Sequence, residues 1–258
     1  MNALPKFTLG GYRDLLLLLR DQGARFSPMS KIEKSACGDV FLRHDIDISL
    51  ELALPMARLE RGLGIASTYY ILLSGPYNPL SASSISAMKE LVSLGHDLGL
   101  HYDLTLYPHD EKSASLKLSR EIDILGEASG VKIETIVMHA PFLGHSDIFE
   151  GSTEWVNPTF FQKNNPRLMY VSDSCRAWRD KSLLDYLNGK PETDRLLLNV
   201  HPESWLAERS VHRLTYLEKI LLPMTLEPTR RYLMETVRPV WQSHVGPVSG
   251  YGDEDEDE

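Results

Sequence analysis

The chain has 258 residues, of which 42% are hydrophobic, 24% charged and 9% aromatic, a composition typical of a globular protein with a buried core. Thirty-six acidic residues against 27 basic ones give a net charge of −9, and six of the acids are the last six residues, so the remainder carries only −3. This balance argues against a nucleic-acid-binding surface, and two cysteines exclude a disulfide scaffold or a four-cysteine zinc module.

Neither a membrane span nor an export signal is predicted. No stretch approaches the roughly 18 consecutive apolar residues of a membrane helix. The N-terminus has no basic region followed by an apolar run and a small-residue cleavage site, so we expect a cytoplasmic protein. We expect one domain over residues 1–245, with a helical N-terminal segment 1–39 packed on it, and a disordered acidic tail over 246–258. The oligomeric state is not predicted.

Strand-like and helix-like segments alternate along the chain. In chain order we expect helix 12–21, strand 40–45, helix 49–61, strand 65–73, helix 84–94, strand 97–101, helix 112–128, strands 135–139, 169–172 and 195–200, and helix 214–237. Pro55 predicts a kink in the second helix, and Pro223 and Pro228 predict interruptions in the last one. Residues 140–167 are rich in Gly, Asn and Pro and are predicted to form a long loop.

Repeated strand–helix units predict a parallel sheet, because a crossover helix returns the chain to a parallel neighbour. Six short apolar strands within about 160 residues favour a (β/α) barrel over an open sheet. No Gly-x-Gly-x-x-Gly follows the first strand, which argues against a dinucleotide-binding fold.

Titratable residues collect where the predicted strands end. Because active sites in parallel-sheet folds lie at the carboxyl ends of the strands, these residues are expected to converge on one rim. The candidates, in chain order, are Asp45 and Asp47 at the end of the first strand, His101 at the end of the third, His139 at the end of the fourth, Asp173 at the end of the fifth and His201 at the end of the last.

Asp45 and Asp47 lie two residues apart on an extended segment, so their side chains point to the same side and repel each other unless a cation lies near them. A divalent metal ion bound by Asp and His side chains would compensate this repulsion, and Zn²⁺ or another first-row ion suits such ligands best. The alternative is a pair of solvated loop acids, one of which caps the following helix. A lone histidine in the position of His101 is more often a core histidine than a ligand, and His201 could serve a capping role.

Three segments in order resemble the polysaccharide deacetylase-like proteins of the NodB-homology group, carbohydrate esterase family 4 (CE4). They are Arg43-His-Asp-Ile-Asp47, Ala66-Ser-Thr-Tyr-Tyr70 and Gly95-His-Asp-Leu-Gly-Leu-His-Tyr102. The first is most similar to a divergent branch with Arg-His-Asp-Val-Asp, some members of which occur in lipopolysaccharide O-antigen loci. The resemblance covers about residues 40–205 and implies a distorted, incomplete (β/α) barrel of six to seven parallel strands.

The resemblance also implies roles for single residues. The leading aspartate of the first motif would be the catalytic base, which is Asp45, and the second would bind the metal, which is Asp47. Ile46 separates them where the family has them adjacent, so the two roles could be exchanged. His101 matches the first of two ligand histidines four residues apart, but Thr105 stands at the second position.

The remaining motifs complete the implied site. The third motif of the family carries Arg-x-Pro, whereas this chain has His139-Ala-Pro141, and His139 could complete the ligand set or orient the base. Asp173 matches an aspartate that orients a neighbour. His201 matches the histidine that would protonate the leaving amine or alkoxide.

These features predict a metal-dependent hydrolase, with Zn²⁺ as the first candidate among first-row metals, that removes an acetyl group from an N- or O-acetylated sugar. The expected substrate is nucleotide-linked, lipid-linked or an oligosaccharide, in surface polysaccharide or O-antigen synthesis. Two alternatives stay open. The first is a small-molecule C–N amide hydrolase of the same superfamily, which the missing second histidine favours. The second is a non-catalytic glycan-binding relative.

Overall fold

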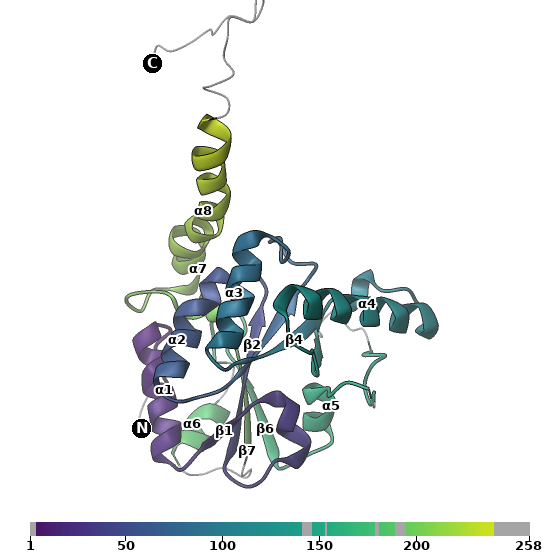
Figure 1. Cartoon of the computed structure of the whole chain (residues 1–258). Coiled ribbons are helices and arrows are strands. Elements are labelled where there is room, and N and C mark those ends of the chain that lie inside the picture. The colour runs from purple at the N-terminus through teal and green to yellow at the C-terminus, as the bar shows by residue number, and fades with distance from the viewer. Residues whose placement is uncertain (1–3, 141–145, 153, 179–180, 189–194, 240–258) are drawn as a thin grey trace, which may run out of the picture. The chain divides into compact units, whose positions relative to one another are not determined.

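The computed structural model describes residues 4–140, 146–152, 154–178, 181–188 and 195–239 (Figure 1). Contacts divide the chain into two compact units, Met1–Arg213 and Leu214–Glu258. The first unit holds every described strand and all the side chains predicted for the site. One domain over 1–245 stays a prediction, and the acidic tail lies outside the described residues.

The sheet consists of parallel strands in the order β5-β4-β3-β2-β7-β6, with β1 paired to the beginning of β2. The incomplete parallel (β/α) barrel predicted from the sequence is therefore confirmed. The strands are β1 Arg25–Ser27, β2 Asp39–Ile46, β3 Thr68–Leu72, β4 Asp97–Tyr102, β5 Ile136–Met138, β6 Leu168–Ser172 and β7 Arg195–Val200.

Strand β1 was not predicted, because three residues are too few to show a periodic pattern. It lies beside residues 39–41 of β2, while β3 pairs with residues 43–46 of the same strand.

The helices are α1 Leu9–Asp21, α2 Leu54–Gly62, α3 Ala82–Ser93, α4 Glu111–Ser129, α5 Pro158–Lys163, α6 Ser182–Leu187, α7 Arg213–Tyr216 and α8 Leu222–Tyr232. Helices α2 to α6 each cross between two consecutive strands from β2 to β7, as the parallel pairing requires, whereas α1 precedes β1 and α7 and α8 follow β7. Short 3₁₀ turns occupy Met29–Lys34, Glu51–Ala53, Leu104–Leu106 and Pro202–Trp205, and π-helical turns occupy Leu217–Leu221 and Leu233–Val237.

The structure corrects three predictions about prolines and loops. Pro55 lies in the first turn of α2, where its missing N–H is not needed, so it causes no kink. Pro223 lies in the first turn of α8, directly after the π-helical turn Leu217–Leu221, so the α-helix is interrupted there as predicted. Pro228 lies inside α8, which continues to Tyr232 without the predicted interruption. The predicted loop 140–167 contains α5, which the Asn157 side chain caps by accepting from two backbone N–H groups.

Alternation along the strands divides the core into an outer and an inner part. On β2, Val40, Leu42 and Ile46 belong to apolar clusters with helix residues, whereas Phe41 packs inside the half-barrel. The inner cluster contains one buried residue from each of several strands: Phe41, Tyr70, Val137, Leu168 and Leu197. This apolar floor lies two to four residues before the polar strand ends, as Val137 does before His139 and Phe41 before Asp45, so the site is built above it.

No helix among the described residues is both long and apolar enough to cross a membrane. The helical segment of the second unit nevertheless exposes many large apolar side chains: Leu214, Leu217, Leu222, Met224, Leu226, Tyr232, Leu233 and Met234.

A buried carboxylate on the outer face joins α1, α2, β2 and β3. Glu60 is fully buried and accepts hydrogen bonds from the hydroxyls of Tyr12 (2.5 Å), Ser67 (2.6 Å) and Tyr69 (3.0 Å), while His44 Nε2 lies 2.8 Å from its Oε1. Burial alone would raise the pKa of Glu60, but His44 and its other partners lower it to about 2. The carboxylate therefore stays ionised inside the protein.

We expect Glu60→Gln to lower the free energy of unfolding by about 3–5 kcal/mol, because the amide lacks the charge that faces His44 and keeps only one oxygen to accept from the three hydroxyls. Since the pKa is depressed from 4.5 to about 2, the ionised carboxylate stabilises the fold above pH 4.5, and this stabilisation is lost as the pH falls toward 2. Urea unfolding at several pH values measures both effects.

The matched control is Glu90→Gln, which removes an exposed partner of Arg58 and should leave stability nearly unchanged. A Glu60→Gln protein as stable as the wild type at pH 7 would show that Glu60 does not stabilise this junction.

Candidate active site

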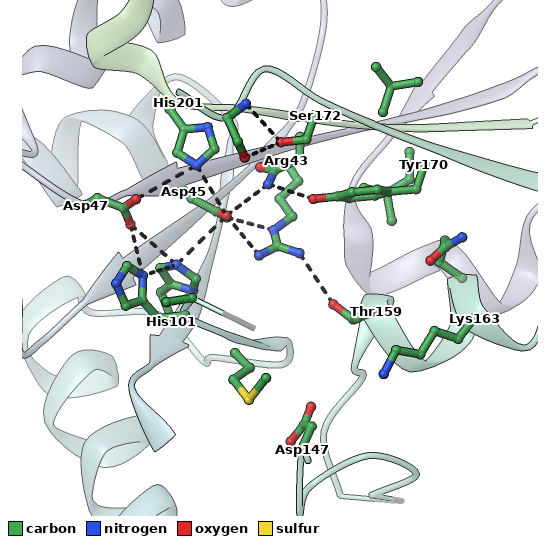
Figure 2. A pocket seen from close by; sticks show the side chains of 18 of the residues that line it. Arg43, Asp45, Asp47, His101, Asp147, Thr159, Lys163, Tyr170, Ser172 and His201 are labelled. Atoms are coloured by element: carbon green, nitrogen blue, oxygen red, sulfur yellow. Dashed lines mark hydrogen bonds and ion pairs between the residues drawn. The ribbon is translucent and has the colours of Figure 1, made fainter. Parts of the chain in front are cut away.

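Strand register brings the predicted residues to one pocket. Arg43 pairs with Asn199 across β2 and β7, and side chains two residues further along each strand, Asp45 and His201, lie on the same inner face. On the other side, the register places His101 of β4 beside Val137 of β5, which is followed two residues later by His139. The pocket has a volume of about 610 Å³ and is lined by five of the six candidates: Asp45, Asp47, His101, His139 and His201 (Figure 2).

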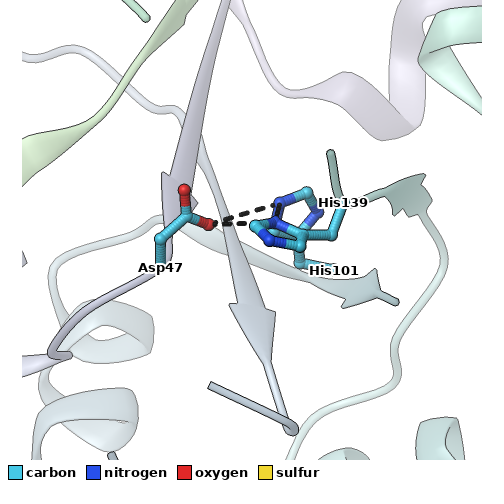
Figure 3. A group of neighbouring side chains, drawn as sticks. All are labelled: Asp47, His101 and His139. Atoms are coloured by element: carbon cyan, nitrogen blue, oxygen red, sulfur yellow. Dashed lines mark hydrogen bonds and ion pairs between the residues drawn. The ribbon is translucent and has the colours of Figure 1, made fainter. Parts of the chain in front are cut away.

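Asp47, His101 and His139 form a compact three-residue cluster (Figure 3). Asp47 Oδ1 lies 3.4 Å from His101 Nε2 and 3.5 Å from His139 Nδ1, and the two histidine nitrogens lie 3.1 Å apart. One ligand atom from each residue falls within 4.8 Å of the others. Three such atoms facing a common point are the arrangement that a first-row divalent metal requires.

The surroundings of the cluster fit a metal ion. His101 Nδ1 lies 3.1 Å from the carbonyl oxygen of Val137, which fixes the N–H on that nitrogen and turns the Nε2 lone pair toward Asp47. Asp47 Oδ1 is buried and has no hydrogen-bond donor among the described residues. An unpaired buried carboxylate oxygen facing two imidazole nitrogens matches the donor set of a Zn²⁺ site.

His139 lies in the cluster, whereas Thr105 does not. Thr105 is exposed and its hydroxyl donates to Asp103 (2.6 Å), so it lies outside the cluster. His139 is held by a hydrogen bond from its backbone N–H to the carbonyl of Tyr102 (2.8 Å), and the next residue, Ala140, has a φ of 46°. A left-handed backbone conformation is unfavourable for alanine, and backbone strain of this kind often occurs beside functional residues.

Asp45 is buried beside the cluster and is held by two partners. Arg43 donates to both carboxylate oxygens, from Nε at 2.7 Å and Nη2 at 2.9 Å, and Asn199 Nδ2 donates to Oδ2 at 3.1 Å. Burial would raise the pKa of Asp45, but the positive charge of Arg43 keeps it below its ordinary value. The carboxylate is therefore ionised, with Oδ2 3.9 Å from His101 Nε2.

Asp173 does not line the pocket but lies behind His201. Fully buried, it contacts Nδ1 of His201 at 2.6 Å and accepts from the His201 backbone N–H (3.0 Å) and the Trp205 indole N–H (2.7 Å). Burial lowers the pKa of His201, but Asp173 raises it well above the ordinary value. A protonated His201 therefore points Nε2 into the pocket, 3.8 Å from Asp47 and 4.0 Å from Asp45.

Several pocket residues had no predicted role. Arg43 and Asn199 each precede a candidate by two residues, so the period-two pattern alone would have placed them on the same face as Asp45 and His201. Thr159, Gln162 and Lys163 of α5 also line the pocket, but that helix was predicted as loop, so no sequence signal pointed to them.

Comparisons with known proteins give likenesses of structure only, since no protein-family model and no curated protein matches the sequence. The chain is similar to a CE4 esterase from Streptococcus mutans, with 16% identity over 84% of this chain and 90% of that one, and a TM-score of 0.43. It is similar to a peptidoglycan deacetylase from Bacillus subtilis, with 14% identity over 78% and 96% of the two chains and a TM-score of 0.43.

A third likeness is to a CE4 family pseudoenzyme from Bacillus anthracis, with 12% identity over 73% of this chain, 60% of that one, and a TM-score of 0.44. All three TM-scores lie below 0.5, so the function is argued from the side chains of the pocket.

We expect Asp47→Asn to weaken the affinity for Zn²⁺ by at least about tenfold, because an amide oxygen is a poorer ligand than a carboxylate. His101→Ala and His139→Ala should do the same. Elemental analysis of protein prepared without chelator, followed by competition with a zinc indicator, measures the effect.

The matched control is Thr105→Ala, at the position where the family would have its second histidine, and it should leave zinc binding unchanged. Full zinc content in His139→Ala would remove that residue from the ligand set.

Proposed function

We propose that this protein is a metal-dependent hydrolase that removes an acetyl group from an N- or O-acetylated sugar. The observation that carries the proposal is the presence in one pocket of a cluster that could hold a metal ion, an ionised carboxylate and a protonated histidine. Metal-dependent hydrolysis of an amide or ester uses three such groups: a Lewis acid, a base for the attacking water and an acid for the leaving group.

The cluster of Asp47, His101 and His139 would hold the ion, with zinc as the first candidate among first-row metals. Bound there, the ion would supply Lewis acidity for the acetyl carbonyl and for the attacking water.

Asp45 is proposed as the general base that takes the proton of the attacking water. Its carboxylate is ionised, and its Oδ2 lies 3.9 Å from the ligand atom of His101. Arg43 and Asn199 occupy part of its hydrogen-bonding capacity and fix its direction. A carboxylate held in this way can accept a proton without reorienting.

His201 is proposed as the general acid that protonates the leaving nitrogen or alkoxide. Asp173 holds Nδ1 and thereby leaves the Nε2 proton directed into the pocket. Nε2 lies within 4.0 Å of both Asp45 and Asp47, so base and acid flank the same point.

The rest of the pocket suits a sugar. Its 610 Å³ lies within the range of small-molecule sites and exceeds what an acetyl group needs. The lining offers hydroxyl groups and aromatic surface: Thr159, Tyr170, Ser172, Ser174 and Trp178. A nucleotide-linked, lipid-linked or oligosaccharide substrate, a role in O-antigen synthesis and a cytoplasmic location stay predictions from the sequence.

Acetate release from a panel of N-acetylated and O-acetylated sugars, with zinc added or removed by chelation, tests the proposal. We expect turnover that is lost with the metal and restored by zinc. Hydrolysis of small amides that persists without metal would favour the C–N hydrolase alternative. Glycan binding without turnover in the zinc-loaded protein would favour the non-catalytic one.

If Asp45 is the base, Asp45→Asn should retain zinc and reduce turnover by on the order of 10²–10⁴-fold, the usual contribution of a general base. Turnover and zinc content are measured on the same preparation. Asp14→Asn, an exposed substitution on α1, is the control and should change neither.

Loss of zinc in Asp45→Asn, with zinc retained in Asp47→Asn, would mean that the two roles are exchanged.

His201→Ala should retain zinc and slow amide hydrolysis by about 10²–10⁴-fold, while an activated aryl acetate, whose leaving group needs no proton, should suffer much less. The ratio of the two rates is the measurement. His109→Ala, at an exposed position, should leave that ratio unchanged. Equal losses on both substrates would contradict the role of leaving-group acid.

A further inference from the structure

The guanidinium of Arg43 fits the Asp45 carboxylate as a two-pronged clamp. Nε and Nη2 each donate to a different oxygen, at 2.7 Å and 2.9 Å, and the Arg43 residue is only 5% exposed (Figure 2). A planar guanidinium bound through two parallel hydrogen bonds fixes both the position and the plane of a carboxylate, which a lysine ammonium cannot do.

Arg43 is itself seated on an aromatic ring. Its Cζ lies 5.6 Å from the centre of the Tyr70 ring, and Tyr70 is fully buried on the neighbouring strand, where it pairs in register with Asp45. Stacking of a guanidinium on an aromatic face is favourable, more so where water is excluded. The ring therefore limits where the guanidinium can lie.

The Tyr70 ring in turn depends on a glycine. Gly99 pairs with Tyr70 across β3 and β4, and a Cβ added there would come within 2.3 Å and 2.5 Å of two ring carbons and 2.7 Å of the Thr135 hydroxyl. The space over Gly99 is thus filled by the Tyr70 ring. Any larger residue would displace the ring and the guanidinium above it.

We propose that Arg43 is the positioning residue of the catalytic base, seated on Tyr70 in the space left by Gly99. The effect of Arg43 on the reaction rate rests on the proposed function, whereas the effect of Arg43 on the position of Asp45 does not. Arg43 also lines the pocket, so the competing role is direct contact with the substrate. Positioning lowers kcat and leaves KM nearly unchanged, whereas lost substrate contact raises KM.

The test uses the zinc-loaded full chain with Arg43→Lys, which keeps the charge but loses the fork. We expect kcat to fall about 10²-fold with KM within about twofold and zinc content unchanged, since a displacement near 1 Å can have an effect of this size. In Arg43→Ala, guanidinium chloride at millimolar concentration should restore part of kcat. Arg58→Lys, in an exposed Arg–Glu pair, is the control and should match the wild type.

Gly99→Ala is the second variant and should lower kcat in the same way, because it shifts the Tyr70 ring. Gly62→Ala, where a Cβ meets nothing within 4 Å, is its control. Crystal structures of Arg43→Lys and Gly99→Ala should show the Asp45 carboxylate moved or rotated while zinc stays bound.

An unmoved Asp45 carboxylate in both variants would overturn the proposal, as would a raised KM with unchanged kcat. Absence of deacetylation by the wild type would reject the proposed function alone, because the crystal structures test the position of Asp45 without any substrate.

Discussion

Two carboxylates at one end of the sheet, Asp45 and Asp173, are buried and a third, Asp47, is partly buried, and burial of a charge is costly unless a partner compensates it. Each has its own partner. Arg43 clamps Asp45, the imidazole of His201 pairs with Asp173, and Asp47 faces two imidazole nitrogens with one oxygen that no described donor reaches. The arrangement of the pocket follows from this need for three separate partners, and the chemistry proposed for it uses the same pairs.

Strand β2 is stabilised by charged groups on both faces, which explains how it can hold two aspartates near its end. On the inner face Arg43 fixes Asp45, and on the outer face His44 lies against the buried carboxylate of Glu60. The outer network ties the strand to α1, α2 and β3 through direct hydrogen bonds to Glu60, none of which involves a pocket residue. The position of the strand therefore does not depend on the occupancy of the pocket, and the site is preorganised by the fold.

Much of the fold and most of the candidate site could be predicted from alternation and strand ends. Parallel strands bring their carboxyl ends together, so Asp45, His101 and His201 could be expected to converge before any geometry was known. What could not be predicted depends on contacts distant in sequence. Helix α5 is six residues long and is held by its Asn157 cap, which a composition rich in Pro and Asn conceals. The place of Arg43 over Tyr70 depends on the space above Gly99, which belongs to a third strand.

The residues in which this sequence differs from the CE4 motifs that it resembles lie at or near the strand ends. The chain lacks the second histidine of the family's second motif and has His139 where the third motif has arginine. In the structure His139 lies beside His101 at the end of β5, where it would supply the second imidazole of the proposed metal site, and Arg43 on β2 contacts Asp45. A parallel half-barrel allows this exchange, because every strand delivers side chains to the same rim. The same type of side chain can therefore reach the same place on the rim from a different strand, and a motif on one strand can be completed by a residue of another strand.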